Sequence, residues 1–291
     1  MSDAPRNETT IDDLIERYDA LLFDAYGVLV RSDGPVDGAL ELLRRLRRQD
    51  TPFLVLTNDA SRTIRASAMR YRAMGLPIEA EHVITSGSLV TGYAHKHNLI
   101  GRPAWVMGPT DARTNAREAG LELLALDAPT DTPFEVCVLA DLPFTDAWPA
   151  VEDTVTRLIR ALDAGRTPRL VLPNPDLIYP RTLNSFGVTS GGAAAMITTI
   201  LEERYPGASF SFDLLGKPHP PIYEQALETL GVPRTRAVMI GDQLATDVRG
   251  ALAVGIDAAL VTTGLVTLSR YEDWPVHPTW LLASLRPSWA P

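Results

Sequence analysis

Cysteine is almost absent from this sequence, since Cys137 is the single one among 291 residues. One thiol excludes a disulfide within the chain and a metal site built from several cysteines. Cys137 lies inside the apolar stretch that runs from Phe134 to Leu139. A cysteine in such surroundings is typical of a buried structural residue, and we interpret it in that way.

Positive charge is also scarce. The formal net charge is -9 at pH 7 and the sequence pI is about 5.1. Binding to nucleic acid needs a basic surface, so we expect no nucleic-acid partner. The densest group of arginines, at positions 44, 45, 47 and 48, lies on one expected helix and is interpreted as its solvated face.

Long apolar runs are missing as well. No stretch approaches the roughly 18–20 apolar residues that cross a bilayer. Residues 1–10 are polar and carry charges of both signs, so they do not resemble a secretory signal. We therefore expect a soluble, cytoplasmic protein that binds no membrane.

What the sequence does have is a large apolar fraction, 45% of its residues, and enough length for one large domain or two ordinary ones. The stretch Leu21–Val30 opens with an apolar run that ends at Asp24, and Gly27 follows three residues later. Because the run has little alternation, it predicts a strand buried on both faces, as in a parallel sheet. Ligands of open α/β sheets bind beyond the carboxyl ends of the strands, where Asp24 is expected.

Three later stretches repeat this arrangement of an apolar run followed by polar residues. They are residues 53–56 before Thr57, residues 209–215 before Lys217, and residues 237–240 before Asp242 and Asp247. Segments of helical periodicity separate these runs, which predicts an α/β fold with parallel strands. Residues 85–207 have their own alternation of strands and helices, and we expect an inserted domain there.

The polar residues at these four strand ends could together serve one reaction, phosphoryl transfer. A carboxylate nucleophile such as Asp24 can approach an anionic phosphate only if a cation offsets the charge, and Asp24 and Asp242 offer the oxygen ligands that Mg²⁺ prefers. Lys217 would hold the nucleophile and the phosphate as a point charge. The Thr57 hydroxyl and nearby N–H groups would bind phosphate oxygens. The intermediate would be an aspartyl phosphate that water hydrolyses.

These residues form a pattern that resembles a known family. Asp24-x-x-Gly27, Thr57-Asn58, Lys217-Pro218 and Gly241-Asp242-x-x-x-Thr246-Asp247, in this order, look like the four motifs of the haloacid dehalogenase superfamily. The wide gap between the second and third motifs resembles class IIA, which has a large α/β cap and includes nitrophenylphosphatases and sugar or nucleotide phosphatases. The resemblance implies a Rossmann-like parallel-sheet core, formed by residues 1–84 and 208–291, with residues 85–207 inserted as the cap.

The resemblance also implies roles for individual residues. Asp24 would be the nucleophile and a metal ligand, and the backbone carbonyl of Tyr26 a second ligand. Asp242 would be the third metal ligand. Asp247 would either bind the metal or contact the residues that bind it. The residues expected to bind phosphate are Thr57, Asn58 and Lys217. Candidates for contact with the substrate are Asp59, Arg62, Asn174 and Asp176, although the stretch from Asn174 to Asp176 also fits a simple turn.

The chain departs from the family pattern at Tyr26. Most phosphatases of the superfamily have an aspartate there, which protonates the leaving oxygen and then activates water. A tyrosine, with an ordinary pKa near ~10, is a poor general base at neutral pH. General acid–base help is worth about 10²–10⁴-fold, so we expect slow hydrolysis of alkyl phosphates or a preference for good leaving groups. Asp59 or a cap residue is an alternative source of the proton.

The same departure leaves two other functions open. The stretch from Phe23 to Gly27 also resembles the first motif of 2-haloacid dehalogenases, which need no metal and whose halide leaves without a proton. The retained Asp242 and Asp247 and the large inserted block argue against that alternative. The other is a phosphate-binding protein that has lost turnover. The function expected first is a Mg²⁺-dependent phosphohydrolase of a small phosphorylated metabolite. A homodimer is a further expectation, with the oligomeric state left open.

Overall fold

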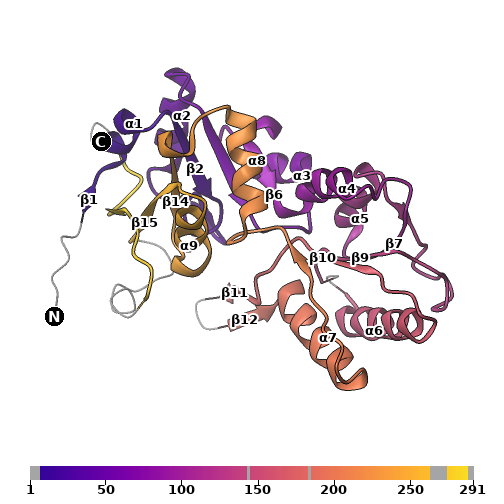
Figure 1. The fold of residues 1–291 in the computed structure, drawn as a ribbon. Coiled ribbons are helices and arrows are strands. Elements are labelled where there is room, and N and C mark those ends of the chain that lie inside the picture. The colour runs from indigo at the N-terminus through magenta and orange to yellow at the C-terminus, as the bar shows by residue number, and fades with distance from the viewer. Residues whose placement is uncertain (1–6, 143–144, 183–184, 263–273, 288–291) are drawn as a thin grey trace. The chain divides into compact units, whose positions relative to one another are not determined.

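The computed structural model describes residues 7–142, 145–182, 185–262 and 274–287 (Figure 1). The chain divides into two compact units. The first consists of residues 1–57, 64–84 and 217–291, and the second of residues 58–63 and 85–216. Both units are built from parallel strands with helices, so the α/β fold class expected from the sequence is confirmed.

In its described residues, the first unit contains a seven-stranded sheet. Its strands, in spatial order, are β1 (Glu8–Thr9), β16 (Trp280–Leu282), β15 (Asp257–Val261), β14 (Ala237–Gly241), β2 (Ala20–Asp24), β5 (Phe53–Thr57) and β6 (Val83–Thr85). The pairs from β1 across to β5 are parallel. Short β3 (Val30–Arg31) and β4 (Gly34–Pro35) form a separate antiparallel pair after β2. The two central strands β2 and β14 are entirely buried, as the apolar runs in the sequence predict.

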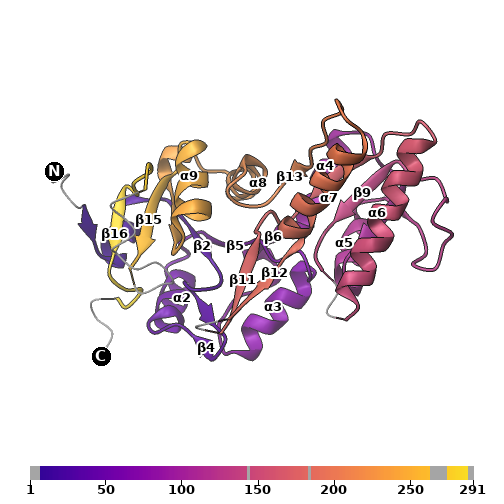
Figure 2. The same ribbon diagram turned by 90° about the horizontal axis from the view of Figure 1, so that it is seen from below.

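Helices cover both faces of this sheet. They are α1 (Ile11–Arg17), α2 (Ala39–Arg48), α3 (Ile64–Ala73), α8 (Pro220–Leu230) and α9 (Arg249–Ala253), with short 3₁₀ turns at Ala80–His82 and Arg234–Arg236. Figure 2 shows α2 and α3 on one side of the strands and α8 and α9 on the other. The core on the side of α1, α2 and α3 combines helix residues such as Leu43 with strand residues such as Phe23 and Val55. Burying so many aliphatic side chains stabilises the sheet that carries the strand ends.

The second unit has a five-stranded sheet among its described residues. Its order is β13 (Asp213–Leu214), β10 (Arg169–Leu172), β9 (Val136–Leu139), β7 (Pro103–Met107) and β8 (Glu122–Leu123), and every pair is parallel. The sequence led us to expect residues 208–216 in the core, but β13 pairs with β10, and the contacts assign this segment to the second unit. An apolar run reveals a strand but not its partner, which is why the sequence misplaced this one.

The helices of the second unit lie on both faces of its sheet. They are α4 (Leu89–Lys96), which follows a 3₁₀ turn at Ser86–Ser88, and α5 (Thr110–Glu118), α6 (Ala147–Asp163) and α7 (Ser190–Arg204). Figure 1 shows α4 and α5 on one side of β9 and β10, and α6 and α7 on the other. The antiparallel hairpin of β11 (Ile178–Thr182) and β12 (Ser185–Val188) leads from β10 into α7. The sequence did not predict this hairpin.

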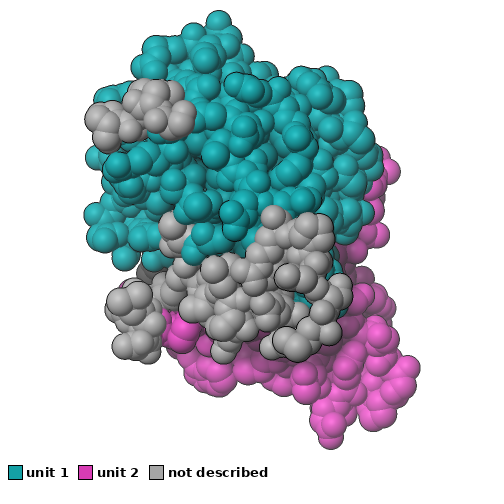
Figure 3. Space-filling view, turned by 90° about the vertical axis from the view of Figure 1, so that its left-hand side faces the viewer, with its two compact units in different colours: residues 1–57, 64–84, 217–291 teal, residues 58–63, 85–216 magenta. Residues whose placement is uncertain are grey.

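The chain passes between the two units at four points, after Thr57, Thr63, Ile84 and Gly216. Figure 3 distinguishes the units by colour. Two of these crossings fall directly beside residues that the sequence associates with phosphate, Thr57 and Lys217. Among the described residues, no helix is long and apolar enough to cross a membrane.

Candidate active site

Three neighbouring strands of the first unit end beside one another. Strand β2 lies between β14 and β5, and both pairs are parallel. Carboxyl ends of parallel strands meet at the same edge of a sheet, which is where ligands bind in open α/β folds. This edge carries Asp24 as the last residue of β2, Thr57 as the last residue of β5, and Asp242 directly after β14.

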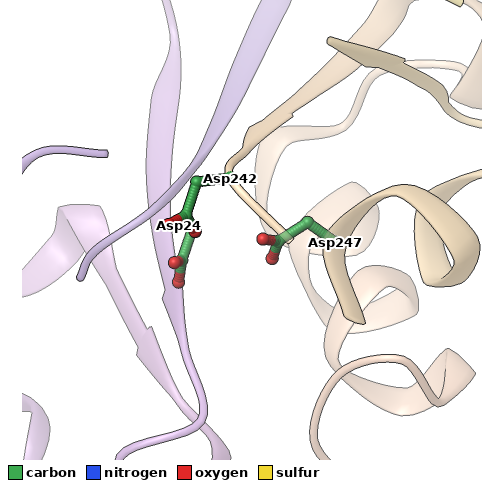
Figure 4. A group of neighbouring side chains, drawn as sticks. All are labelled: Asp24, Asp242 and Asp247. Atoms are coloured by element: carbon green, nitrogen blue, oxygen red, sulfur yellow. The ribbon is translucent and has the colours of Figure 1, made fainter. Parts of the chain in front are cut away.

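Asp24, Asp242 and Asp247 form a cluster of buried carboxylates (Figure 4). Each offers one oxygen, and these oxygens all lie within 4.8 Å of one another. Asp247 belongs to a π-helical turn, Leu244–Val248, and the N–H of Gln243 donates to its Oδ2 at 3.2 Å. Carboxylates taken out of water at such short separations require a compensating cation, so the arrangement is suited to binding positive charge.

Lys217 supplies part of that charge. Its Nζ donates to Oδ1 of Asp24 at 2.5 Å and to Oδ1 of Asp247 at 2.8 Å, and its side chain is buried. The sequence has 27 lysines and arginines together, and Lys96 is the one other lysine. A compact ammonium fits between two carboxylates, whereas a planar guanidinium with five donors would need more space and more acceptors.

The electrostatics of this group follow from its burial. Burial raises the pKa of Asp24 well above its ordinary value, and the ammonium of Lys217 opposes that shift only in part. Burial alone would lower the pKa of Lys217, but the carboxylates of Asp24 and Asp247 raise it well above its ordinary value. Lys217 is therefore cationic at neutral pH. A ligand that brings further positive charge to the cluster would favour the ionised form of Asp24.

The residues present fit a divalent cation of the Mg²⁺ type. The donor set consists of carboxylate oxygens, which suit a hard cation. The absence of a side chain at Gly241 leaves room for Asp247 in this cluster. A Cβ at position 241 would lie only 2.2 Å from the Cβ of Asp247. Asp24 and Asp242 would hold the ion at the strand ends. Asp247 would assist while it also holds Lys217. The expected role of the Tyr26 carbonyl as a ligand stays a prediction.

Tyr26 follows Asp24 by two residues and is only partly buried. Its backbone forms an isolated bridge with Val30, and the N–H of Gly27 donates to the Val30 carbonyl at 2.8 Å. The loop after β2 is thus closed by its own backbone. The side chain of Tyr26 is a phenol, and its expected effect on proton transfer stays a prediction.

Tyr223 is a buried residue of this region that the sequence did not single out. Its hydroxyl donates to the carbonyl of Thr246 at 3.0 Å and lies 3.3 Å from that of Asp247. It therefore supports the turn that carries Asp247. Its position on α8, six residues after Lys217, was the available signal, but an aromatic residue on an amphipathic helix is equally typical of a core residue.

Asn58, the second expected phosphate-binding residue, is bonded within the second unit. Its Nδ2 donates to Oδ1 of Asp176 at 2.9 Å, and its carbonyl accepts from the Ser86 hydroxyl at 2.7 Å. Asp176 in turn donates its N–H to Oδ1 of Asn174 at 3.1 Å. The structure thus brings two of the tentative substrate residues, Asn174 and Asp176, together with Asn58.

The other two tentative substrate residues, Asp59 and Arg62, pair with each other. Nη1 of Arg62 lies 2.6 Å from Oδ2 of Asp59. The other carboxylate oxygen of Asp59 accepts from the N–H of Ser61 at 2.9 Å and from its hydroxyl at 2.6 Å. These bonds shape the segment that follows Thr57. Contact of either residue with a substrate stays a prediction.

Asp141 is a second acidic residue that the sequence analysis missed. It follows β9 with one residue between, much as Asp242 follows β14, so the signal of an apolar run ending in a carboxylate was present. Burial raises its pKa to about 6, and the nearby charges of Asp59 and Asp176 add to the shift while Arg62 opposes it. The second unit therefore carries a partly buried carboxyl group that titrates close to neutrality.

Comparisons with known proteins agree with this geometry. A family model described as haloacid dehalogenase-like hydrolase matches residues 21–122, and a second, described as HAD-hydrolase-like, matches residues 214–288. The chain is 29% identical to a dihydroxyacetone phosphatase of Corynebacterium glutamicum, over 91% of this chain and 88% of that protein. It is 27% identical to an acid sugar phosphatase of Staphylococcus aureus, over 93% and 96% of the two chains. The crystal structure of a possible sugar phosphatase of the HAD superfamily from Cytophaga hutchinsonii superposes with a TM-score of 0.83 at 26% identity, covering 97% of this chain and 99% of that one.

Proposed function

Because this chain belongs to the haloacid dehalogenase-like hydrolases, in the class with a large α/β cap, we propose that it is a Mg²⁺-dependent phosphatase that hydrolyses a small phosphate monoester. The observation that carries the proposal is the buried cluster in which Lys217 bridges Asp24 and Asp247 beside Asp242. A nucleophilic carboxylate, a fixed ammonium and two further carboxylates are groups suited to phosphoryl transfer to a protein side chain.

The proposed reaction has two steps at Asp24. In the first, a carboxylate oxygen of Asp24 attacks phosphorus, the bond from phosphorus to the ester oxygen breaks, and the alcohol leaves after taking up a proton. In the second, water attacks the phosphorus of the aspartyl phosphate, and inorganic phosphate and the Asp24 carboxylate are released. Lys217 stabilises the charge that gathers on the phosphoryl oxygens. The hydroxyl of Thr57, at the neighbouring strand end, would bind one of those oxygens.

The carboxylates of Asp24, Asp242 and Asp247 would hold the magnesium ion. When bound, Mg²⁺ would offset the negative charge of the phosphate and fix its orientation relative to the nucleophile. Lys217 remains essential alongside it, because it fixes the side chain of Asp24 through the bond to its Oδ1. Asp247 holds Lys217 from the other side, so that the ammonium stays in place when Asp24 is phosphorylated.

Tyr26 shapes the expected substrate range. With no carboxyl group at this position, protonation of the leaving oxygen depends on water or on another residue. General acid–base catalysis is worth about 10²–10⁴-fold, so alkyl phosphates are expected to react slowly and aryl phosphates faster. We propose a phosphorylated sugar or triose as the natural substrate class. The names of the similar phosphatases from Corynebacterium glutamicum and Staphylococcus aureus support this choice.

The alternatives considered from the sequence are not favoured. The similar proteins described above carry the names of phosphatases, and none of these names denotes a dehalogenase. The acidic cluster that a metal-free dehalogenase does not need is assembled and buried. The names of the similar proteins also denote enzymes with turnover and not binding proteins.

The test is an assay of phosphate release from p-nitrophenyl phosphate and a panel of sugar and triose phosphates, with Mg²⁺ and with EDTA. Halide release from 2-chloropropionate is measured in parallel. Phosphate release that EDTA abolishes and Mg²⁺ restores would support the proposal. Halide release that persists in EDTA would contradict it, as would a folded protein that binds Mg²⁺ but releases phosphate from none of these esters.

A further inference from the structure

Two of the four crossings between the units fall next to residues of the proposed phosphate site. The chain leaves the first unit after Thr57, so that Asn58 belongs to the second unit, and it returns after Gly216, directly before Lys217. Because each pair is joined by one peptide bond, the contacts that hold Asn58 and Gly216 also constrain the positions of Thr57 and Lys217.

The turn from Pro173 to Asp176, at the end of β10, contacts both of these residues. The N–H of Gly216 donates to the carbonyl of Pro173 at 2.9 Å, which continues the pairing of β13 with β10. The carboxylate of Asp176 accepts from Nδ2 of Asn58 at 2.9 Å. One turn of the second unit thus binds the residue after Thr57 and the residue before Lys217.

Asn58 also lies against Gly216. A Cβ on Gly216 would lie 2.6 Å from Oδ1 of Asn58 and 2.6 Å from the Pro173 carbonyl, so a side chain there has no space. An ionised carboxylate only accepts hydrogen bonds, and it therefore requires the amide nitrogen of Asn58 on its own side. This orientation turns the amide oxygen toward Gly216. Asp176 thereby determines how the Asn58 side chain packs between the two crossings.

The turn is itself fixed by several bonds. The N–H of Asp176 donates to Oδ1 of Asn174, and the Asp176 carbonyl accepts from the hydroxyl of Thr189. The hydroxyl of Ser190 donates to the Asn174 carbonyl at 3.0 Å. A Cβ on Gly191 would lie 2.4 Å from the carbonyl of Asp176, so α7 begins in close contact with the turn. Asp176 is thus a rigid anchor and not a free surface acid.

We propose that Asp176 is a positioning residue for phosphate binding, acting through Asn58 on the segments that carry Thr57 and Lys217. The inference rests on the proposed function, and it assigns Asp176 a role that does not require contact with the substrate. Hydrogen bonds to a charged ligand depend on the position of the donor, and the loss of one such bond weakens binding by about 10- to 100-fold. A hydrogen bond in the second unit would in this way control the affinity for phosphate.

The experiment compares Asp176→Ala, Asp176→Asn, Asn58→Asp and the exchanged pair Asn58→Asp with Asp176→Asn. Asp163→Ala is the matched control, because Asp163 is also an aspartate of the second unit that accepts a hydrogen bond, from Tyr205, but lies at the end of α6. The dissociation constant of inorganic phosphate is measured by calorimetry in the presence of Mg²⁺. The kcat and KM for p-nitrophenyl phosphate and the Tm are measured for each variant.

Asp176→Ala is expected to weaken phosphate binding by about 10- to 100-fold, with KM rising in parallel, because a displaced donor loses its hydrogen bond to the charged ligand. Asp176→Asn is expected to lose less phosphate affinity, because its Oδ1 can still accept the hydrogen bond from Nδ2 of Asn58. Asn58→Asp places two carboxylates opposite each other and is expected to lose at least as much phosphate affinity as Asp176→Ala. The exchanged pair restores one donor and one acceptor and is expected to recover most of the affinity. Asp163→Ala is expected to retain wild-type affinity.

Unchanged phosphate affinity in folded Asp176→Ala would overturn the proposal, as would an exchanged pair no better than its single variants. If Asp176→Ala does not fold, the comparison of Asn58→Asp with the exchanged pair decides alone. If the wild-type protein binds phosphate without turnover, the proposed function is refuted. The phosphate affinities of the variants would still test the role of Asp176. Wild-type protein that neither binds phosphate nor turns over would overturn both.

Discussion

Gly27 faces the carboxylate of Asp242 with no space for a side chain. A Cβ at this position would lie 2.2 Å from Oδ2 of Asp242, and the backbone of Gly27 has a φ of +96°. Two independent constraints, the left-handed backbone and the contact with a proposed metal ligand, therefore both require glycine. The loop after β2 approaches the carboxylate cluster this closely because Gly27 carries no side chain.

We expect Gly27→Ala to reduce kcat/KM by at least about 100-fold, because the new methyl group must displace Asp242. Gly75→Ala is the matched control. Gly75 has a similar φ of +86°, but no atom lies within 4 Å of the position of its Cβ. Both variants are expected to lose about 1–3 kcal/mol of stability through backbone strain, measured by denaturant unfolding. Equal activity in the two variants would show that the contact with Asp242 is unimportant.

We expect Asp24→Asn to lower phosphate release by at least about 10³-fold, since an amide cannot serve as the nucleophile. The side chain keeps its shape, and burial already disfavours the charged form of Asp24, so Tm is expected to stay within a few degrees of wild type. Asp19→Asn is the control. It lies directly before the same strand, and its carboxylate binds Arg236 at 2.6 Å on the surface. Substantial turnover by folded Asp24→Asn would remove Asp24 from the mechanism.

The candidate residues that the structure brings together in one cluster are those for which a local pattern is sufficient. Asp24 and Asp242 each follow an apolar run, and parallel strands bring such ends to one edge whatever the rest of the chain does. Lys217 was found in the same way. The fold class follows from the alternation of strands and helices, which is also a local signal.

What the sequence could not supply are contacts between distant segments. The hydrogen bond from Asn58 to Asp176 joins residues 118 positions apart, and no periodic pattern in the sequence predicts it. The pairing of β13 with β10 has the same character. Asp141 was missed for another reason: its signal was present, but within the inserted block only Asn174 and Asp176 were interpreted as candidates for contact with the substrate. In both units, the end of a buried strand therefore predicts where a carboxylate of low exposure lies.

We expect Tyr26→Asp to raise turnover of alkyl phosphates relative to p-nitrophenyl phosphate by about 10- to 100-fold, because an added carboxyl group can protonate a poor leaving oxygen. Tyr26→Asn is the control for loss of the phenol without gain of an acid, and it is expected to leave the ratio unchanged. The measurement is kcat/KM for glycerol phosphate and for p-nitrophenyl phosphate with each variant. A ratio that does not move in Tyr26→Asp would mean that another group already supplies the proton.

Asp141 gives a prediction for the dependence of stability on pH. Its pKa is raised by burial from 3.8 to about 6, with the carboxylates of Asp59 and Asp176 opposing its ionisation and Arg62 favouring it. The folded state therefore holds this proton more tightly than the unfolded state. Between pH 3.8 and about 6, the contribution of Asp141 to the free energy of unfolding falls as pH rises, and this contribution is lost above about pH 6. A shift of this size, discounted for partial solvent exposure, corresponds to about 1–3 kcal/mol.

Asp141→Asn removes the charge but keeps an oxygen that can accept from the N–H of Leu142, as Oδ1 of Asp141 does at 2.8 Å. We therefore expect the variant to be more stable than wild type by about 1–3 kcal/mol at pH 7.5, and to match it at pH 4. Denaturant unfolding at both pH values measures the difference. Asp163→Asn is the control, because hydrogen bonding by Tyr205 lowers the pKa of that carboxyl and its ionisation favours the folded state. A gain at pH 7.5 in both variants would point to a general effect of net charge, whereas a gain in Asp141→Asn alone would identify the cost of ionising this buried group.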